Sequence, residues 1–110
     1  MHDVPETDSK VFRELQSHAL ERFCKRALGK VQSILSDGSW THHKRYLEVF
    51  RLLRTRDEEI AHAFNDPRRS RMIIQLAAIY SYGLIEPNEL GRFTDRTRTT
   101  IVSLGQEFTR

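Results

Sequence analysis

The chain has 110 residues, of which 38% are hydrophobic and 30% are charged, a length that suits one domain with one core. No run of about 18 apolar residues occurs, so we expect no membrane-spanning helix. The formal net charge is only +3, and its whole excess lies between Thr41 and Arg71, where eight basic residues stand beside five acidic ones.

The N-terminal segment, MHDVPETDSK, is polar and acidic. It lacks the basic and apolar regions of a secretory signal. The single cysteine, Cys24, has no second cysteine with which to form a disulfide in this chain, which favours a reducing compartment. We therefore expect a cytoplasmic protein with a flexible tail over residues 1–8 and one helical domain over residues 9–110.

A first helix is predicted from Asp8 or Ser9, acting as its cap, to about Leu35. Its apolar residues recur every three or four positions, the spacing that forms one stripe along a helix. They are Phe12, Leu15, Ala19, Phe23, Ala27, Val31 and Ile34. The sequence SDGS then ends the helix, with Gly38 free to adopt a left-handed conformation.

A second amphipathic helix is predicted over residues 41–64, and Asp57 falls within its apolar face. Two interpretations remain open. Asp57 is buried and paired with an arginine from another helix, because an unpaired buried carboxylate is costly. Alternatively, the helix breaks near Thr55, since TRDE has the form of a capping box, and Asp57 is exposed.

A third helix, predicted over residues 67–82, is apolar on all sides after Arg71, with only Gln75 and Ser81 as polar positions. A helix of this kind is surrounded by other elements. It forms either the centre of the core or a subunit interface, and the sequence leaves both open. Gly83 is predicted to end it.

Two short helices follow, one opened by Pro87 and one preceded by Thr94 as a possible cap. No alternating strand pattern appears. The predicted fold is therefore an all-α, compact helical bundle of two long amphipathic helices, one buried helix and two short C-terminal helices.

The sequence predicts no catalytic residue, metal site or cofactor. It lacks a phosphate-binding loop, a dinucleotide fingerprint and a zinc spacing. One Glu-x-x-His pair, Glu59 and His62, has the spacing used by di-iron helical proteins, but such a site needs a second copy of the motif. His42 and His43 are adjacent, so their side chains diverge on a helix. We expect no enzyme activity.

Five arginines make up the candidate binding set: Arg51, Arg54, Arg68, Arg69 and Arg71. The last three crowd the first turn of the third helix, where the helix dipole favours anions rather than cations. They either pair locally with the acidic residues 57–59 or bind an external anion, which is a partner's acidic surface or a phosphate backbone.

The predicted function is a non-enzymatic, small helical protein-interaction or regulatory module that forms a homodimer and docks on another macromolecule. The dimer is inferred from the apolar third helix and the broad face of the first. One alternative is a nucleic-acid-binding protein that uses the arginine-rich surface. Another is a metal-dependent enzyme whose Glu-x-x-His site is completed across a dimer.

Overall fold

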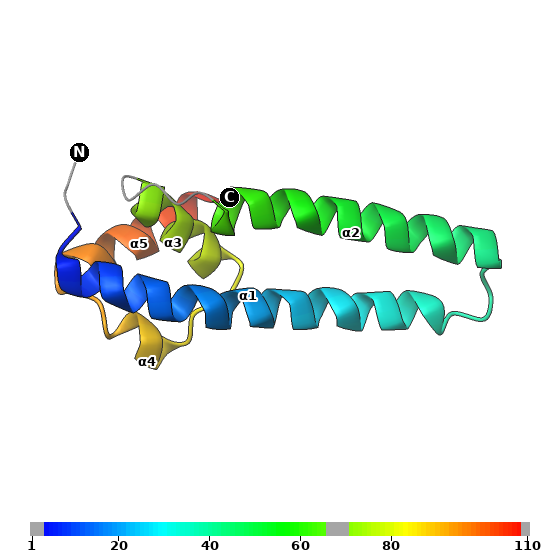
Figure 1. Cartoon of the computed structure of the whole chain (residues 1–110), viewed down its shortest axis with the longest axis horizontal. Helices are drawn as coiled ribbons and strands as arrows, with labels where there is room; N and C mark the ends of the chain where they lie inside the picture. Colours follow the sequence, from blue (N-terminus) through cyan, green and yellow to red (C-terminus); the bar gives the residue numbers. More distant parts are fainter. Residues whose placement is uncertain (1–3, 66–70, 109–110) are drawn as a thin grey trace.

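The computed structural model consists of two long antiparallel helices with three shorter ones at one end (Figure 1). It describes residues 4–65 and 71–108, and within them no strand occurs. The helices are α1 (Glu6–Leu35), α2 (His42–Phe64), α3 (Met72–Ser81), α4 (Pro87–Leu90) and α5 (Asp95–Phe108). The all-α prediction is confirmed. The molecule is elongated, with extents of 52 × 26 × 25 Å.

The start of α1 differs from the prediction. The helix begins at Glu6 with Pro5 at the cap position, so the proposed cap at Asp8 or Ser9 is wrong. Residues 6–8 of the expected tail therefore belong to the helix. Asp8 and Ser9 are each 1% exposed, because Asp8 points into the protein and binds the residue that precedes α5 instead of capping its own helix.

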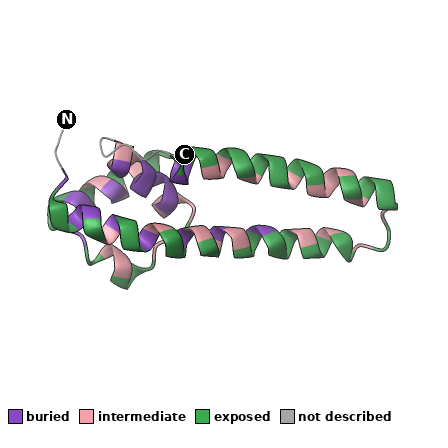
Figure 2. Ribbon diagram, viewed as in Figure 1, coloured by how far each residue is buried: buried purple, intermediate pink, exposed green. Residues whose placement is uncertain are grey.

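The core lies where the short helices pack against the long ones, and α3 is at its centre (Figure 2). Leu76 and Ile79 of α3 are each 1% exposed, and α3 packs against α1, α2 and α5 of the same chain. The apolar third helix is therefore buried within one subunit. The predicted start of α3 at Pro67 lies outside the described residues, whereas its end at Gly83, with a φ of 72°, is confirmed.

The second long helix, α2, is continuous. Thr41 caps it, since its hydroxyl oxygen accepts a hydrogen bond from the backbone N–H of Lys44 at 3.0 Å. No break occurs at Thr55, and Asp57 is exposed. The interpretation that Asp57 is buried is wrong, and the alternative is right about the exposure of Asp57 but wrong about the break. A continuous helix exposes this side chain where no other described element covers it.

Arg22 is one of the α1 residues that fasten the short helices to α1. The guanidinium of Arg22 donates to both carboxylate oxygens of Glu89, at 2.7 and 2.9 Å, and to the backbone carbonyl of Leu84 at 2.8 Å. These hydrogen bonds from Arg22 hold the pKa of Glu89 below its usual range. Glu89 also accepts the backbone N–H of Glu86, and the two form the capping box of α4. None of the described helices has the length and apolar character of a membrane span.

Candidate functional site

The half of the α1–α2 pair that lies away from the short helices is the most unusual part of the molecule. We call residues 28–62 the arm. Buried residues occur on α1 up to Ala27 and on α2 from Ala63, but none occurs in the arm (Figure 2). Helices in proteins draw most of their stability from packing of an apolar face. The arm therefore presents surface that the chain itself does not cover.

The tip of the arm is held by short-range contacts. The carboxylate of Asp37 accepts hydrogen bonds from the hydroxyl and the backbone N–H of Ser39, which lower the pKa of Asp37. The ammonium of Lys44 lies 4.5 Å from the centre of the Trp40 ring, a cation–π contact. These contacts fix the turn between α1 and α2, so the two helices keep one alignment along the arm.

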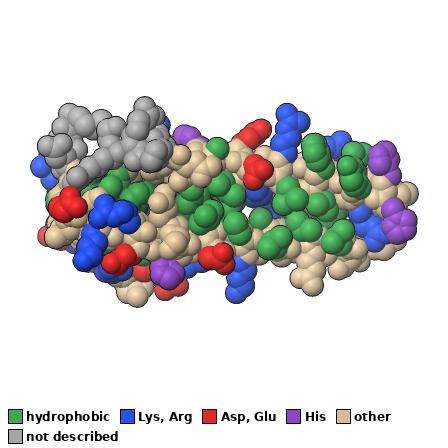
Figure 3. All heavy atoms as spheres, in the orientation of Figure 1, with side chains coloured by type: hydrophobic (Ala, Val, Ile, Leu, Met, Phe, Trp, Pro, Cys, Tyr) green, Lys and Arg blue, Asp and Glu red, His purple; other side chains and the backbone are tan. Residues whose placement is uncertain are grey.

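One side of the arm is apolar. Among the described residues, the large hydrophobic side chains that remain exposed are Leu28, Leu35, Tyr46, Phe50, Leu53 and Phe108, and all but Phe108 belong to the arm. Figure 3 shows hydrophobic side chains gathered there over both helices. Tyr46 is 68% exposed and Phe50 is 55% exposed. We call this side the apolar face.

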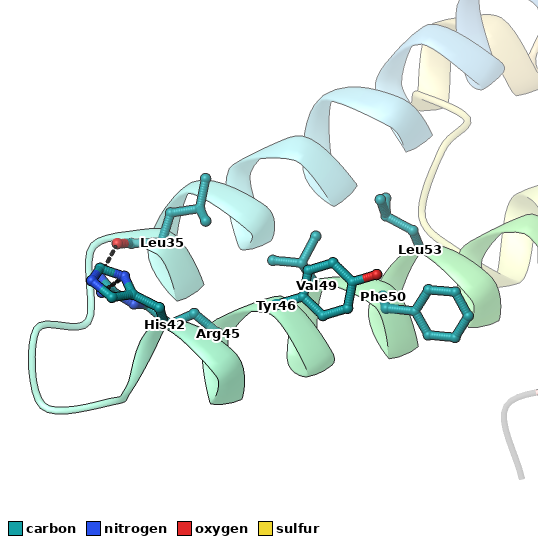
Figure 4. Close-up of a pocket in the computed structure, with 7 residues that line it drawn as sticks. All are labelled: Leu35, His42, Arg45, Tyr46, Val49, Phe50 and Leu53. Atoms are coloured by element: carbon teal, nitrogen blue, oxygen red, sulfur yellow. Dashed lines mark hydrogen bonds between the residues drawn. The ribbon is translucent and has the colours of Figure 1, made fainter.

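A hollow of about 520 Å³ follows the apolar face (Figure 4). Its lining consists of Leu35, His42, Arg45, Tyr46, Val49, Phe50 and Leu53. Arg45 closes its end near the tip by donating to the carbonyl of Leu35 and to Nδ1 of His42, both at 2.9 Å. Because an arginine N–H is always a donor, Nδ1 of His42 accepts and its Nε2 carries the proton. His42 therefore offers an N–H at this end of the apolar face.

The apolar face follows a symmetric row along α2. In chain order the row is His42, Tyr46, Val49, Phe50, Leu53 and Asp57. At about 100° per residue these six positions lie on one side of the helix. They are also symmetric in position about the midpoint between Val49 and Phe50. A hydrogen-bond donor, His42, stands at one end, and an acceptor, Asp57, stands at the other.

The opposite flank of the arm carries a second hollow, which we call the basic groove. It has a volume of about 480 Å³ and runs between α1 and α2, where it is lined by Lys30, Ser33, Ile34, Glu48, Arg51, Leu52, Thr55 and Arg56. A smaller cavity of about 200 Å³ adjoins it through Lys30 and Arg56, and adds Arg26 and Glu59 to the lining. On α2, positions 48, 51 and 55 lie roughly opposite the row of the apolar face.

The three predicted arginines that the structure describes, Arg51, Arg54 and Arg71, do not lie together. Arg51 lines the basic groove and pairs with Glu48 at 2.9 Å. Arg54 is exposed and lines neither hollow. Arg71 is partly buried at the start of α3, in the other half of the molecule. Arg68 and Arg69 lie outside the described residues. A single anion site formed by all five therefore remains an untested prediction.

The other candidate residues form no recognisable site. Glu59 pairs with Arg56, while His62 is exposed. Over residues 4–65 and 71–108, no three His, Cys, Asp or Glu side chains are grouped as metal ligands would be. Cys24 is a half-buried free thiol on α1.

Sequence reasoning missed Arg26, Lys30 and Arg56 as neighbours. The spacing of Arg26 and Lys30 at i and i+4 indicates a shared helix face. Nothing in the sequence, however, shows that α2 presents arginines along the same groove. That placement depends on how the two helices align.

No protein-family model and no curated protein sequence matches the chain. Two solved structures match its fold: the Fluorescence Recovery Protein from Synechocystis sp PCC 6803 and a mutant of that protein in which one arginine is replaced by lysine. Each is 22% identical in sequence with a TM-score of 0.76, and each alignment covers 93% of this chain and 97% of the other. The chain is therefore similar in fold, over nearly its whole length, to the Fluorescence Recovery Protein.

Proposed function

We propose that the protein is a non-enzymatic regulatory module that forms a homodimer through the apolar face of the arm and docks on another protein. The observation that carries this proposal is the arm itself, where large apolar side chains are exposed and no residue is buried. Contiguous apolar surface of this kind marks interaction sites in soluble proteins.

The pattern along α2 favours a second copy of the chain as the occupant of the apolar face. In a two-fold dimer the same patch lies on both subunits and must complement itself. If two α2 helices pack in opposite directions about the midpoint of Val49 and Phe50, Tyr46 of one copy lies opposite Leu53 of the other. His42 then lies opposite Asp57, so the Nε2–H of one copy meets the carboxylate of the other.

Parallel packing of α2 is less favourable. It would place Asp57 beside Asp57 and leave the N–H of His42 without an acceptor across the interface. Like charges placed directly opposite each other are destabilising. The antiparallel arrangement also gives Asp57, an acidic residue among apolar neighbours, a partner.

The regulatory part of the proposal is supported by the fold comparison. The Fluorescence Recovery Protein, which has a similar fold, is named for a process rather than for a chemical reaction. The single cysteine is compatible with a cytoplasmic location.

Nucleic-acid binding is the alternative function. It would draw on Arg51 and Arg54 in the arm, but each of these arginines lies close in sequence to acidic side chains, such as Glu48 and Asp57. A phosphate backbone requires a continuous basic surface. We therefore place protein docking first.

The experiment is a measurement of molar mass by sedimentation equilibrium as a function of concentration. We expect the wild-type chain to approach twice its 13.0 kDa monomer mass, and Phe50→Glu to remain near the monomer mass. Phe108→Glu is the matched control, because Phe108 is also an exposed phenylalanine but lies outside the arm. A wild-type mass that stays at one chain over the whole concentration range would contradict the proposal.

A further inference from the structure

We propose that the basic groove binds an acidic segment of a partner protein, in which two carboxylates lie about one helical turn apart with an aliphatic side chain between them. This inference rests on the proposed function, because it names the chemistry of the docking partner. The basic groove is a different surface from the apolar face, so the groove proposal and the dimer proposal can be tested separately.

On the α1 side, Lys30 of the groove and Arg26 of the adjoining cavity supply positive charge without an ion pair to a described carboxylate. The guanidinium of Arg26 donates to the backbone carbonyls of Tyr82 and Gly83, at 2.7 and 2.8 Å, which fixes its position. Lys30 makes no hydrogen bond or ion pair with any described residue. Arg26 and Lys30 are four positions apart on α1, about 6 Å along the helix axis.

The α2 wall supplies arginines that are already ordered. Arg51 pairs with Glu48, and Arg56 pairs with Glu59. A side chain held by a neighbour has less conformational entropy to lose when a ligand binds. Counted together, four cationic and two anionic side chains line the groove and the adjoining cavity, so their lining is positive. A partner carboxylate therefore has most to gain beside Arg26 and Lys30.

Ile34 and Leu52 contribute the apolar part of the groove, and both are half-buried. An aliphatic side chain between the two carboxylates would bury apolar area against them, which is favourable. The hydroxyl of Thr55 lies in the same lining. An acidic segment with one apolar side chain meets each of these features.

A nucleic-acid strand fits the groove less well. Its phosphates recur along the backbone without interruption, and Glu48 and Glu59 in the lining would repel them. Two aromatic rings line the adjoining cavity, and both already pack within the chain: Phe23 is 7% exposed and contacts Phe64, and the half-buried Tyr82 contacts Phe23. Because acidic and basic side chains both line this groove and its adjoining cavity, a protein segment fits better than a nucleic-acid strand.

The test is fluorescence anisotropy with a fluorescein-labelled helical peptide that carries two glutamates four positions apart around a leucine. The comparison probes are the same peptide with glutamines and a single-stranded DNA oligonucleotide. The variants are Lys30→Glu and, as the matched control, Lys25→Glu, which changes an exposed lysine of α1 that lines neither the groove nor its adjoining cavity. Phe50→Glu is added to separate the groove from the dimer.

We expect the glutamate peptide to bind wild type and Lys25→Glu alike, and Lys30→Glu at least about tenfold more weakly, the equivalent of one charge-assisted contact. The glutamine peptide should bind about tenfold more weakly than the glutamate peptide. Three results would overturn the inference. They are no binding of the glutamate peptide, an equal loss of peptide affinity in Lys30→Glu and Lys25→Glu, or tighter binding of the DNA than of the glutamate peptide.

The two proposals are distinguished by combining this assay with the molar mass. If the wild type is dimeric but does not bind the peptide, the groove proposal is contradicted and the dimer proposal stands. If the wild type is monomeric and its peptide binding is lost in Lys30→Glu, the dimer proposal is contradicted and the groove proposal stands. Phe50→Glu is expected to be monomeric and still bind the peptide, because Phe50 does not line the basic groove.

Discussion

The carboxylate of Asp8 accepts two hydrogen bonds from Thr94, a residue 86 positions further along the chain. Oδ1 accepts the backbone N–H at 2.9 Å and Oδ2 accepts the hydroxyl at 2.7 Å. Asp8 is 1% exposed whereas Thr94 is exposed, so these bonds form at the edge of the core. They join the first turn of α1 to the residue that precedes α5, and the first and last helices are thereby tied together.

Replacing Asp8 with alanine should destabilise the fold. The change removes the hydrogen bonds that Thr94 donates to a charged acceptor, and such a bond contributes about 1.5–3 kcal/mol. Asp8→Asn keeps one acceptor oxygen and should lose less. Chemical denaturation measures both, with Glu21→Ala as an exposed control on the same helix. Equal stability of Asp8→Ala and Glu21→Ala would show that the bond to Thr94 contributes nothing.

Stability should fall in acid through Asp8 and Glu89. Burial alone would raise the pKa of Asp8, but hydrogen bonds from Thr97 and Thr94 outweigh it and lower the pKa. Hydrogen bonds from Arg22 lower the pKa of Glu89. A carboxyl whose pKa is lowered by folding stabilises the protein above its unfolded-state pKa, and this stability is lost as the pH falls through the folded-state pKa.

The thermal midpoint should therefore decline from about pH 5 downward. In the double variant Asp8→Asn, Glu89→Gln the decline should be shallower, because two of the responsible groups no longer titrate. Midpoints measured by circular dichroism between pH 3 and pH 7 test this, because that range brackets the ordinary carboxyl pKa values of about 3.9 to 4.3. Parallel curves for the two proteins would assign the acid sensitivity to other groups.

Gln75→Leu should stabilise the protein. Gln75 is 2% exposed on α3, and neither polar atom of its amide has a hydrogen-bond partner in the structure. Leucine has a similar size and removes the cost of an unsatisfied amide, a gain of about 1–3 kcal/mol. Gln16→Leu is the contrasting variant, since the Gln16 amide donates to the carbonyl of Phe64 at 2.9 Å. Denaturation midpoints should move in opposite directions.

The antiparallel register of the proposed dimer predicts a specific cross-link. With Cys24 replaced by serine, a mixture of Tyr46→Cys and Leu53→Cys chains should form a disulfide between unlike copies. Each variant alone should form little, because seven positions separate Tyr46 from Leu53, or about 10 Å along the helix. Non-reducing electrophoresis reads the result. Strong cross-linking of Tyr46→Cys with itself would indicate a parallel dimer instead.

Local patterns in the sequence predicted much of the fold. The three-and-four spacing of apolar residues located the long helices, and Thr41 and Gly83 marked a start and an end correctly. The Asp8 cap failed because a local pattern cannot show that this carboxylate serves a helix at the other end of the chain. Asp57 seemed to require a buried partner or a break because it lies within the apolar face of α2, but this face is exposed in the described part of the chain.

The candidate site was less predictable for a related reason. The sequence showed an excess of cations over residues 41–71, yet a groove also needs the opposing helix. The tight tip between Asp37 and Thr41 sets the alignment that brings Lys30 beside Arg56. This alignment is a tertiary property that depends on packing between helices, and the periodicity of either helix alone does not contain it.

The absence of buried residues over residues 28–62 has a consequence for the order of the arm itself. A helical hairpin without a covered face opens locally at low cost, so in the proposed dimer the neighbouring chain should add to the helical stability of each arm, while an arm without a neighbour stays mostly helical. Helix content and dimerisation are then thermodynamically linked. On dilution, the far-ultraviolet signal should weaken together with the fraction of dimer, and amide hydrogens in the arm should exchange faster, while those around α3 keep their protection.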